Sequence, residues 1–392
     1  VAEYPGDLEG WYLLGESLFH IQEFAPQPPD SAIAAFDHVL QADSTLLPAT
    51  IHQLDLALLY RDRARFDRTR RLFETYASPV QREALEVAAG IAWGPLPSDS
   101  ALRRAFASGD ASFPVMALRS LYQQPNATSD TLLSVYRWAQ DAGSQPGEVP
   151  AGALTQRATA MVGMGRLKEA VPLTDSLLAA GAEAGAGLLA DPLGLGIADS
   201  TYGAGRLDSL IRTQLRPGAF RAYANAFMAL TRGRVVEARR DIDAGLALGD
   251  TVGEFGRGRL IAIRGWASLI AGDTVAGVRD LREGVELAAG PGRSGPTAFL
   301  RFQLALALSA RPETRAEGIR WLRYGFSTWN EFIPLAYLAL GRAWEAAGER
   351  DSAAFAYGRF VHLWDNADPP LQSRVQEARE APARLSSEPR KP

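Results

Sequence analysis

Hydrophobic side chains recur along most of this chain at the spacing of amphipathic helices. Apolar residues return at helical intervals between Leu335 and Trp344, and after a short turn Ala353, Tyr357 and Phe360 continue the same pattern. Residues spaced i, i+4 and i+7 lie on one face of a helix. Each stretch therefore predicts a helix with one buried face, and the alternating pattern of strands does not occur in the sequence.

Tight turns separate the predicted helices. A glycine followed by a polar residue recurs at Gly165-Arg166, Gly205-Arg206, Gly233-Arg234, Gly272-Asp273 and Gly348-Glu349. Glycine is favoured at a helix end because the left-handed backbone there disfavours a Cβ atom. The 76 residues from Gly272 to Gly348 contain a further turn at 310–312, which gives steps of 38 residues. Such steps lie close to the period of about 34 residues of helix–turn–helix repeats.

The predicted unit is an antiparallel pair of helices, and one of these pairs resembles a tetratricopeptide repeat (TPR). Its small and aromatic residues are Gly341, Ala353 and Tyr357. Other pairs match at Trp11, Gly15, Ala32 and Phe36, at Ala158 and Ala170, and at Ala226 and Ala238. The resemblance implies an all-α, right-handed α-solenoid of about ten TPR-like helical hairpins, in which these residues pack the helices of a pair against each other.

Two longer sequence segments make the resemblance to TPR proteins more specific. YPGDLEGWYLLGE spans residues 4–16, and LWDNADP spans residues 363–369. Together they resemble the carboxy-terminal TPR arrays of bacterial Ser/Thr protein kinases and related multidomain signalling proteins. The resemblance implies a regulatory or partner-binding region of a larger protein. The chain begins at Val1 without a leader pattern, and we interpret it as a fragment.

The repeat pattern divides the chain into four parts. Residues 1–76 are predicted to hold TPR-like repeats with a proline-rich insertion at 24–29, and residues 77–149 degenerate helical repeats with helices at 81–90, 101–107 and 131–142. Regular repeats follow at 150–368, and a boundary is expected near 143–150. Residues 369–392 are expected to form a capping helix interrupted at Pro382, with a disordered tail from Ser386.

Composition narrows the possible partners. The 392 residues carry a formal net charge of -4, without the basic excess of nucleic-acid-binding modules, so no nucleic-acid partner is expected. The sequence has no cysteine, which excludes disulfides and thiolate metal sites. It has no uncharged apolar run of 18 residues, so no membrane insertion of this chain is expected. The sequence does not determine the cellular compartment of the protein.

Motifs for catalysis and for cofactors are missing from the sequence. It contains no Walker loop, no dinucleotide fingerprint, no G-x-S-x-G and no H-E-x-x-H. The four histidines, His20, His38, His52 and His362, show no i, i+4 pairing with one another, and we identified no carboxylate at a ligand spacing. We therefore expect no enzyme activity, no cofactor and no metal site.

An arginine-rich stretch is the candidate binding surface. Residues 61–71 contain six arginines and two aspartates, and Arg61, Arg65 and Arg68 are the candidate partner-binding residues. Arginine forks could bind an acidic peptide or a phosphate. The alternative is a solvated face whose charges pair at i, i+4, as Arg63–Asp67 and Asp67–Arg71 would. Mixed charge runs favour this alternative.

The predicted function is a protein-interaction scaffold. In a solenoid the first helices of successive pairs would line a concave groove that suits a protein or peptide partner. The aromatic residues between 321 and 364 could anchor such a partner, although helical spacing favours core positions for most of them. Two alternatives remain: a small-molecule-sensing domain of a transcription regulator, recognisable by a deep polar pocket, and an α-toroid enzyme, which would need convergent acids.

Overall fold

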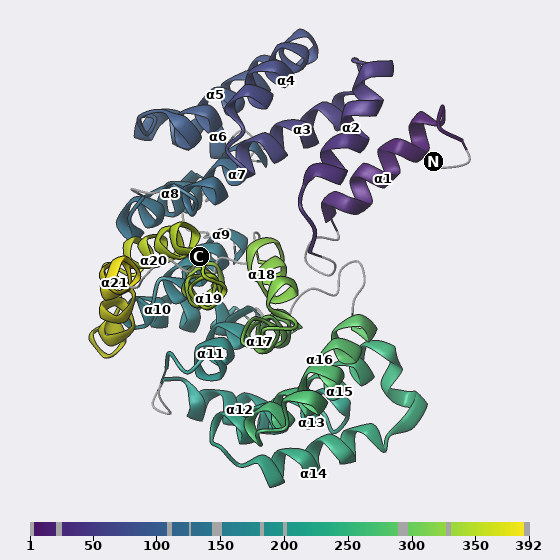
Figure 1. Cartoon of the computed structure of the whole chain (residues 1–392), viewed down its shortest axis with the longest axis vertical. Helices are drawn as coiled ribbons and strands as arrows, with labels where there is room; N and C mark the ends of the chain where they lie inside the picture. Colours follow the sequence, from purple (N-terminus) through teal and green to yellow (C-terminus); the bar gives the residue numbers. More distant parts are fainter. Residues whose placement is uncertain are drawn as a thin grey trace. The chain divides into compact units, whose positions relative to one another are not determined.

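The computed structural model describes residues 4–20, 26–107, 112–124, 127–142, 151–180, 184–198, 202–288, 297–326 and 331–387. Within these ranges every regular element is a helix (Figure 1). The chain divides into two compact units: the first contains residues 1–157 and 358–366, and the second contains residues 158–357 and 367–392. In the part of the chain described, no helix is long and apolar enough to cross a bilayer.

The amino-terminal helices of the first unit run from α1 to α8. Their bounds are α1 Leu8–His20, α2 Asp30–Ala42, α3 Leu47–Leu59, α4 Arg63–Tyr76, α5 Pro79–Trp93, α6 Asp99–Ala107, α7 Ser112–Leu121 and α8 Ser129–Ala142. The expected boundary at 143–150 lies outside the described residues. The division between the two compact units falls within the next helix, α9.

The remaining helices belong wholly or mainly to the second unit. Their bounds are α9 Ala151–Gly163, α10 Leu167–Ala179, α11 Ala184–Gly194, α12 Ala204–Thr213, α13 Ala219–Thr231, α14 Val235–Leu246, η1 Gly249–Val252, α15 Gly253–Ile270, α16 Thr274–Leu287, α17 Thr297–Ser309, α18 Arg315–Tyr324, α19 Ile333–Ala347, α20 Arg350–Leu363, η2 Pro369–Leu371 and α21 Gln372–Ser387. Here η denotes a short 3₁₀ helix. The end of α20, from residue 358, belongs to the first unit.

Neighbouring helices pack in pairs. The pairs α1/α2, α3/α4, α13/α14, α15/α16 and α17/α18 are in close contact, and α2/α3, α14/α15 and α16/α17 connect one pair to the next. Figure 1 shows α1 beside α2 as one such pair. An isolated pair cannot bury its apolar face, so stacking supplies the core. This arrangement confirms the predicted all-α fold of TPR-like helical hairpins.

The hairpin turns share one hydrogen-bond pattern. Gly165, Gly233, Gly272 and Gly348 all have a positive φ. The next residue donates its N–H to a carbonyl five positions back, as Glu349 does to Trp344. This bond is the signature of the Schellman motif. The predicted turn at Gly205 is wrong: Gly205 lies inside α12, and the positive φ belongs to Gly203.

The described residues between 77 and 142 form helices α5 to α8, which do not pair as sequential hairpins. Helix α5 packs on α7 and α6 packs on α8, so the pairs are interleaved. The predicted helices at 81–90, 101–107 and 131–142 correspond to α5, α6 and α8, whereas α7 was not predicted. Helix α7 also packs on α3. As a result every residue of α3 from Gln53 to Leu59 is buried.

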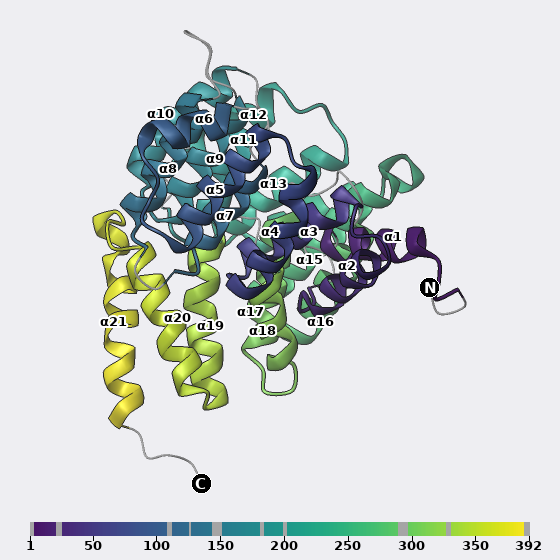
Figure 2. The ribbon, with the colours of Figure 1, turned by 90° about the horizontal axis from the view of Figure 1, so that it is seen from above.

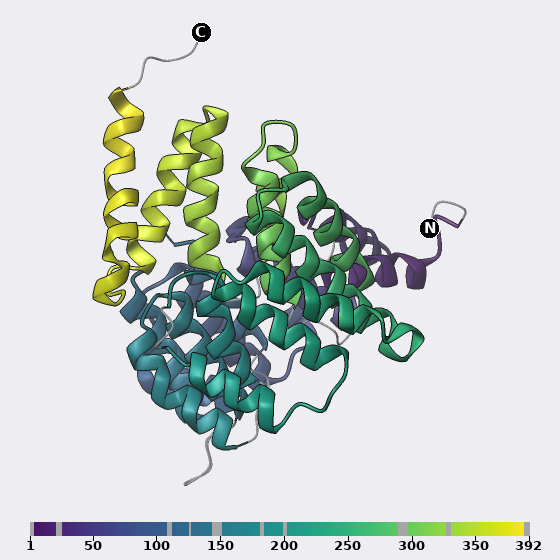
Figure 3. The same cartoon turned by 90° about the horizontal axis from the view of Figure 1, so that it is seen from below.

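The carboxy-terminal helix packs against the hairpin that precedes it. Helix α19, the first half of α20 and α21 lie side by side (Figures 2 and 3), and Arg384 of α21 pairs with Glu345 of α19 at 2.8 Å. The predicted interruption at Pro382 is wrong, because α21 continues through it to Ser387. The expected disorder is wrong for Ser386 and Ser387, which are helical. Residues 388–392 lie outside the described part.

Some contacts join segments far apart in the sequence. In the first unit the guanidinium of Arg359 donates to the carbonyls of Leu121, Tyr122 and Ala127 near the end of α7. In the second unit the carboxylate of Asp368 accepts the N–H of Lys168 at 3.0 Å. Both units therefore contain contacts beyond sequence neighbours, unlike an ideal repeat array, in which each repeat contacts only the next ones.

Candidate functional site

Arg65 of the arginine-rich stretch lies inside a polar network. Its Nη1 atom donates to Asp37 of α2 at 3.1 Å and to Gln53 of α3 at 3.0 Å. Gln53 also donates to Asp37 at 2.9 Å. The side chain of Arg65 is only 16% exposed. Arg65 therefore connects α4 to α2 and α3 and has little surface to offer a partner.

Arg61 has a structural position as well. It is the one described non-glycine residue with a positive φ, 58°, and it occupies the turn between α3 and α4. Asp62 donates its N–H to Ala57, which is the bond seen in the glycine turns. The Arg61 guanidinium donates to the carbonyl of Ala92 at 2.6 Å, and partial burial lowers its pKa.

The outer face of α4 differs from its inner face. Arg63 pairs with Asp67 at 3.0 Å, and Arg70 pairs with Glu74 at 2.6 Å. Arg68 and Arg71 are exposed, and no carboxylate of the described residues pairs with either. Helical spacing places both on one face with the exposed side chains of Leu72 and Tyr76, which are 37% and 54% exposed. We call Arg68, Arg71, Leu72 and Tyr76 the α4 surface.

The α4 surface does not lie where a concave groove would bind a partner in the second hairpin, α3/α4. The arginines lie on α4, the second helix of its pair, whereas a groove would be lined by first helices. The first helix here is α3, and it is covered by α2, α4 and α7. The α4 surface therefore lies on the second helix of its pair and not on the helix that the groove would use.

The residues chosen for repeat packing lie in the hairpin interiors, with Trp11 partly buried. The buried members are Gly15, Ala32, Phe36, Ala158, Ala170, Ala226, Ala238, Gly341, Ala353 and Tyr357. A Cβ added to Gly341 would lie 2.7 Å from the ring of Tyr357, and one added to Gly15 would lie 2.6 Å from the ring of Phe36. Both hairpins thus bring a glycine of one helix against an aromatic ring of the other.

Most aromatic residues near the carboxy terminus belong to the core. Phe326, Phe332, Tyr357, Phe360 and Trp364 are buried. Phe355 is exposed, and Trp329 lies outside the described residues. Core packing is therefore the role of most of the described aromatic candidates.

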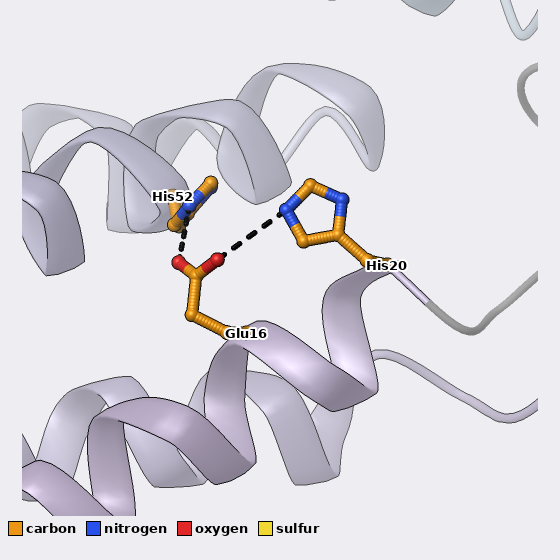
Figure 4. Close-up of side chains that lie close together, drawn as sticks. All are labelled: Glu16, His20 and His52. Atoms are coloured by element: carbon orange, nitrogen blue, oxygen red, sulfur yellow. Dashed lines mark ion pairs between the residues drawn. The ribbon is translucent and has the colours of Figure 1, made fainter. Parts of the chain in front are cut away.

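Two histidines and a glutamate converge between the first two hairpins. Figure 4 shows the carboxylate of Glu16 between His52 of α3 and His20 of α1. One oxygen lies 2.6 Å from His52 Nε2, and the other lies 3.4 Å from His20 Nε2. One donor atom from each of the three residues lies within 4.8 Å of the others. We call Glu16, His20 and His52 the histidine cluster.

The residues around the histidine cluster raise the pKa of His52. Its Nδ1 atom lies 3.7 Å from Asp55, and its ring packs against Phe19 and Phe36. Burial alone would lower the pKa of His52, but the neighbouring carboxylates of Asp55 and Glu16 outweigh it and raise the pKa. Burial, with a contribution from Glu16, raises the pKa of Tyr12 to about 12.

Part of this cluster has a signal in the sequence. Glu16 precedes His20 by four residues, which places both on one face of α1. This pair is a carboxylate at a ligand spacing, so the expectation that the sequence has none is wrong. The contribution of His52 had no sequence signal, because it depends on how α3 packs beside α1. His38 lies elsewhere, stacked on Trp11.

The second unit contains a cleft at the junction of α14, η1, α15 and α16. Its volume is about 520 Å³. The lining includes four charged residues, Glu254, Arg257, Arg264 and Glu283. Arg264 is paired with Asp280 at 2.7 Å. The volume suits a small molecule, but ligand sites usually have a mainly apolar lining.

Comparison with known proteins gives a distant structural likeness. No family model matches the chain, and no curated protein matches it. Among solved structures, the chain is similar to the TPR domain of P58(IPK), with 12% identity, a TM-score of 0.26 and coverage of 98% of this chain and 100% of that chain. This TM-score is too low to support a fold assignment. The assignment therefore rests on the helices, turns and contacts described above.

Proposed function

We propose that this chain is a protein-interaction module that binds an acidic partner through the α4 surface. The observation that carries the proposal is the division of the arginines on α4. Arg63, Arg65 and Arg70 have carboxylate partners within the chain. Arg68 and Arg71 are exposed beside Leu72 and Tyr76, which leaves two cations next to two apolar side chains.

The chemistry of the α4 surface favours a partner segment with acidic and apolar residues. Arginine and tyrosine are among the residue types enriched in binding hot spots. Carboxylates of a partner would form charge-assisted hydrogen bonds with the two guanidinium groups. Tyr76 and Leu72 would gain stabilisation by burying apolar area against it. Helix α4 is held by the Arg65 network, so the surface would be ordered before binding.

Peptide selection on the whole chain tests the proposal. Peptides displayed on phage should enrich acidic sequences with an apolar residue, and the double variant Arg68→Glu/Arg71→Glu should bind the selected peptides at least about tenfold more weakly, the effect of 1.4 kcal/mol. Association should slow as salt rises, since exposed charges are screened.

A matched variant separates this surface from general charge effects. Arg239→Glu/Arg240→Glu changes two exposed arginines on α14, next to the exposed Val236. Its affinity for the selected peptides should stay within about twofold of the unmodified chain. Equal losses in both double variants, or selected peptides without acidic residues, would contradict the proposal. Arg65 is excluded from the variants because it stabilises the fold.

We further propose a bacterial signalling protein, with a Ser/Thr kinase-like domain, as the parent of this region. The support is the resemblance of residues 4–16 and 363–369 to the arrays of such proteins. The genomic sequence upstream of Val1 tests it: a kinase domain in the same reading frame is expected, and a different domain there would refute the parent.

A second candidate function is small-molecule sensing at the cleft of the second unit. The volume of about 520 Å³ and the four charged residues in its lining favour it. A metabolite that raises the melting temperature of the chain and loses this effect in Arg257→Ala would support sensing. The α4 surface is favoured because its two arginines have no carboxylate partner in the described structure, whereas Arg264 of the cleft is already paired.

A further inference from the structure

We propose that the histidine cluster binds one divalent transition-metal ion of the zinc class, and that this ion connects α1 to α3. Two imidazoles and a carboxylate form the donor set. Zinc sites with two histidines, one glutamate and an open position have this composition. Imidazole ligands favour zinc, nickel, copper and iron, whereas calcium and magnesium favour oxygen ligands. The site is separate from the α4 surface.

The spacing of the donors supports binding of an ion. A metal–ligand distance of about 2.1 Å places neighbouring donors of a tetrahedral ion about 3.4 Å apart. The distance from Glu16 Oε2 to His20 Nε2 is 3.4 Å, and the distance from the other carboxylate oxygen, Oε1, to His52 Nε2 is 2.6 Å. One donor from each residue lies within 4.8 Å of the others. Small side-chain adjustments would therefore suffice to surround one ion.

Charge and the outer contacts of the cluster also favour a cation. Glu16 and Asp55 contribute two negative charges when ionised, while a histidine that binds a metal is neutral. A divalent ion would balance these charges. Asp55 lies 3.7 Å from Nδ1 of His52, the ring nitrogen away from Glu16. Carboxylates on the far nitrogen orient metal-binding histidines in many proteins.

Binding would stabilise the junction of the first two hairpins. Gly15 is the only buried residue of α1, and the side chains of Trp11, Tyr12, Leu18 and Phe19 pack against the core while staying partly exposed. Glu16 and His20 lie on α1, and His52 lies on α3. An ion held by all three would join the two helices. The exposed side chain of His20, 63% accessible, leaves an entry path and room for a water ligand.

Titration of the untagged whole chain with zinc chloride tests the site. Calorimetry should give one zinc ion per chain, and cobalt(II) should produce visible absorption typical of low coordination numbers. His20→Ala should weaken zinc affinity at least tenfold. It should leave the melting temperature of the metal-free protein within about 2 °C, because the side chain is exposed. Glu16→Gln should weaken zinc affinity as well.

His362→Ala is the matched control. His362 is also an exposed histidine in the last turn of a helix, and its replacement should leave zinc affinity and stoichiometry unchanged. The proposal is overturned if the unmodified chain binds no stoichiometric zinc. It is overturned equally if His20→Ala binds zinc as tightly as the unmodified chain, since the three groups would then form only a hydrogen-bonded cluster.

Discussion

Residue 61 is an arginine in a left-handed turn that glycine occupies in four other hairpins. The hydrogen bond from Asp62 to Ala57 forms as in those turns. A side chain in this conformation is disfavoured by roughly 1–2 kcal/mol. The bond from the guanidinium to Ala92 offsets part of that strain. The sequence gives no glycine signal for a turn at residue 61, and Arg61 was a binding candidate because it belongs to the arginine-rich stretch.

This turn gives a prediction about two substitutions at one position. Both Arg61→Ala and Arg61→Gly lose the bond to Ala92, but only glycine relieves the strain of the positive φ. We expect Arg61→Gly to be more stable than Arg61→Ala by about 1 kcal/mol in urea unfolding. Arg63→Ala, at an exposed position of α4, should change stability by no more than about 0.5 kcal/mol. Alanine equal to or better than glycine would rule out the left-handed turn.

At the level of the helices, small residues determine how closely the two helices of a hairpin approach each other. Gly341 of α19 lies against the ring of Tyr357, and Gly15 of α1 lies against the ring of Phe36. In the pair α15/α16 the approach is closer still, because a Cβ on Gly265 would lie 2.6 Å from the backbone nitrogen of Leu281. In the hairpins with a glycine turn the small positions could be identified from the sequence, since Ala158, Ala226 and Gly341 stand at the same distance before their turns.

Gly341→Leu tests this packing. The added side chain would enter the space of Tyr357 and push α19 and α20 apart, so we expect a loss of about 1–3 kcal/mol in the free energy of unfolding. Ala353→Leu should behave similarly. Glu349→Ala, at the exposed turn, should stay within about 0.5 kcal/mol. Hydrogen exchange should show lost protection in α19, α20 and α21, with α13 and α14 unaffected; a neutral Gly341→Leu would disprove the close approach.

At the scale of the whole molecule, contacts between distant parts of the sequence modify the repeat array. Arg359 is 1% exposed, and its three carbonyl acceptors lie about 230 residues away in the chain. Ser129 at the start of α8 donates to Asp365 at 2.5 Å in the same unit. In the second unit Asp368 contacts the start of α10. Stability is therefore shared between non-neighbouring hairpins within each unit.

Arg359→Met tests this long-range coupling. Methionine fills a similar volume but leaves the carbonyls at the end of α7 without their donor, and each buried unsatisfied group costs about 1–3 kcal/mol. We expect destabilisation in that range, with hydrogen-exchange protection lost in α7 and α8 as well as in α20. Arg342→Met removes an exposed ion pair with Glu377 and should cost less than about 1 kcal/mol. Loss confined to α20 would refute the coupling.

Most of the helices, most of their turns and the small residues inside the hairpins are evident in the sequence alone. These features depend on residues within about 40 positions of one another, so their spacing is visible along the chain. Only the tertiary structure decided that α7 covers α3, that Arg65 is internal while Arg68 is exposed, and that His52 meets Glu16 and His20. Each of these depends on which helices become neighbours when apolar faces are buried, and no periodicity in a single sequence encodes that choice.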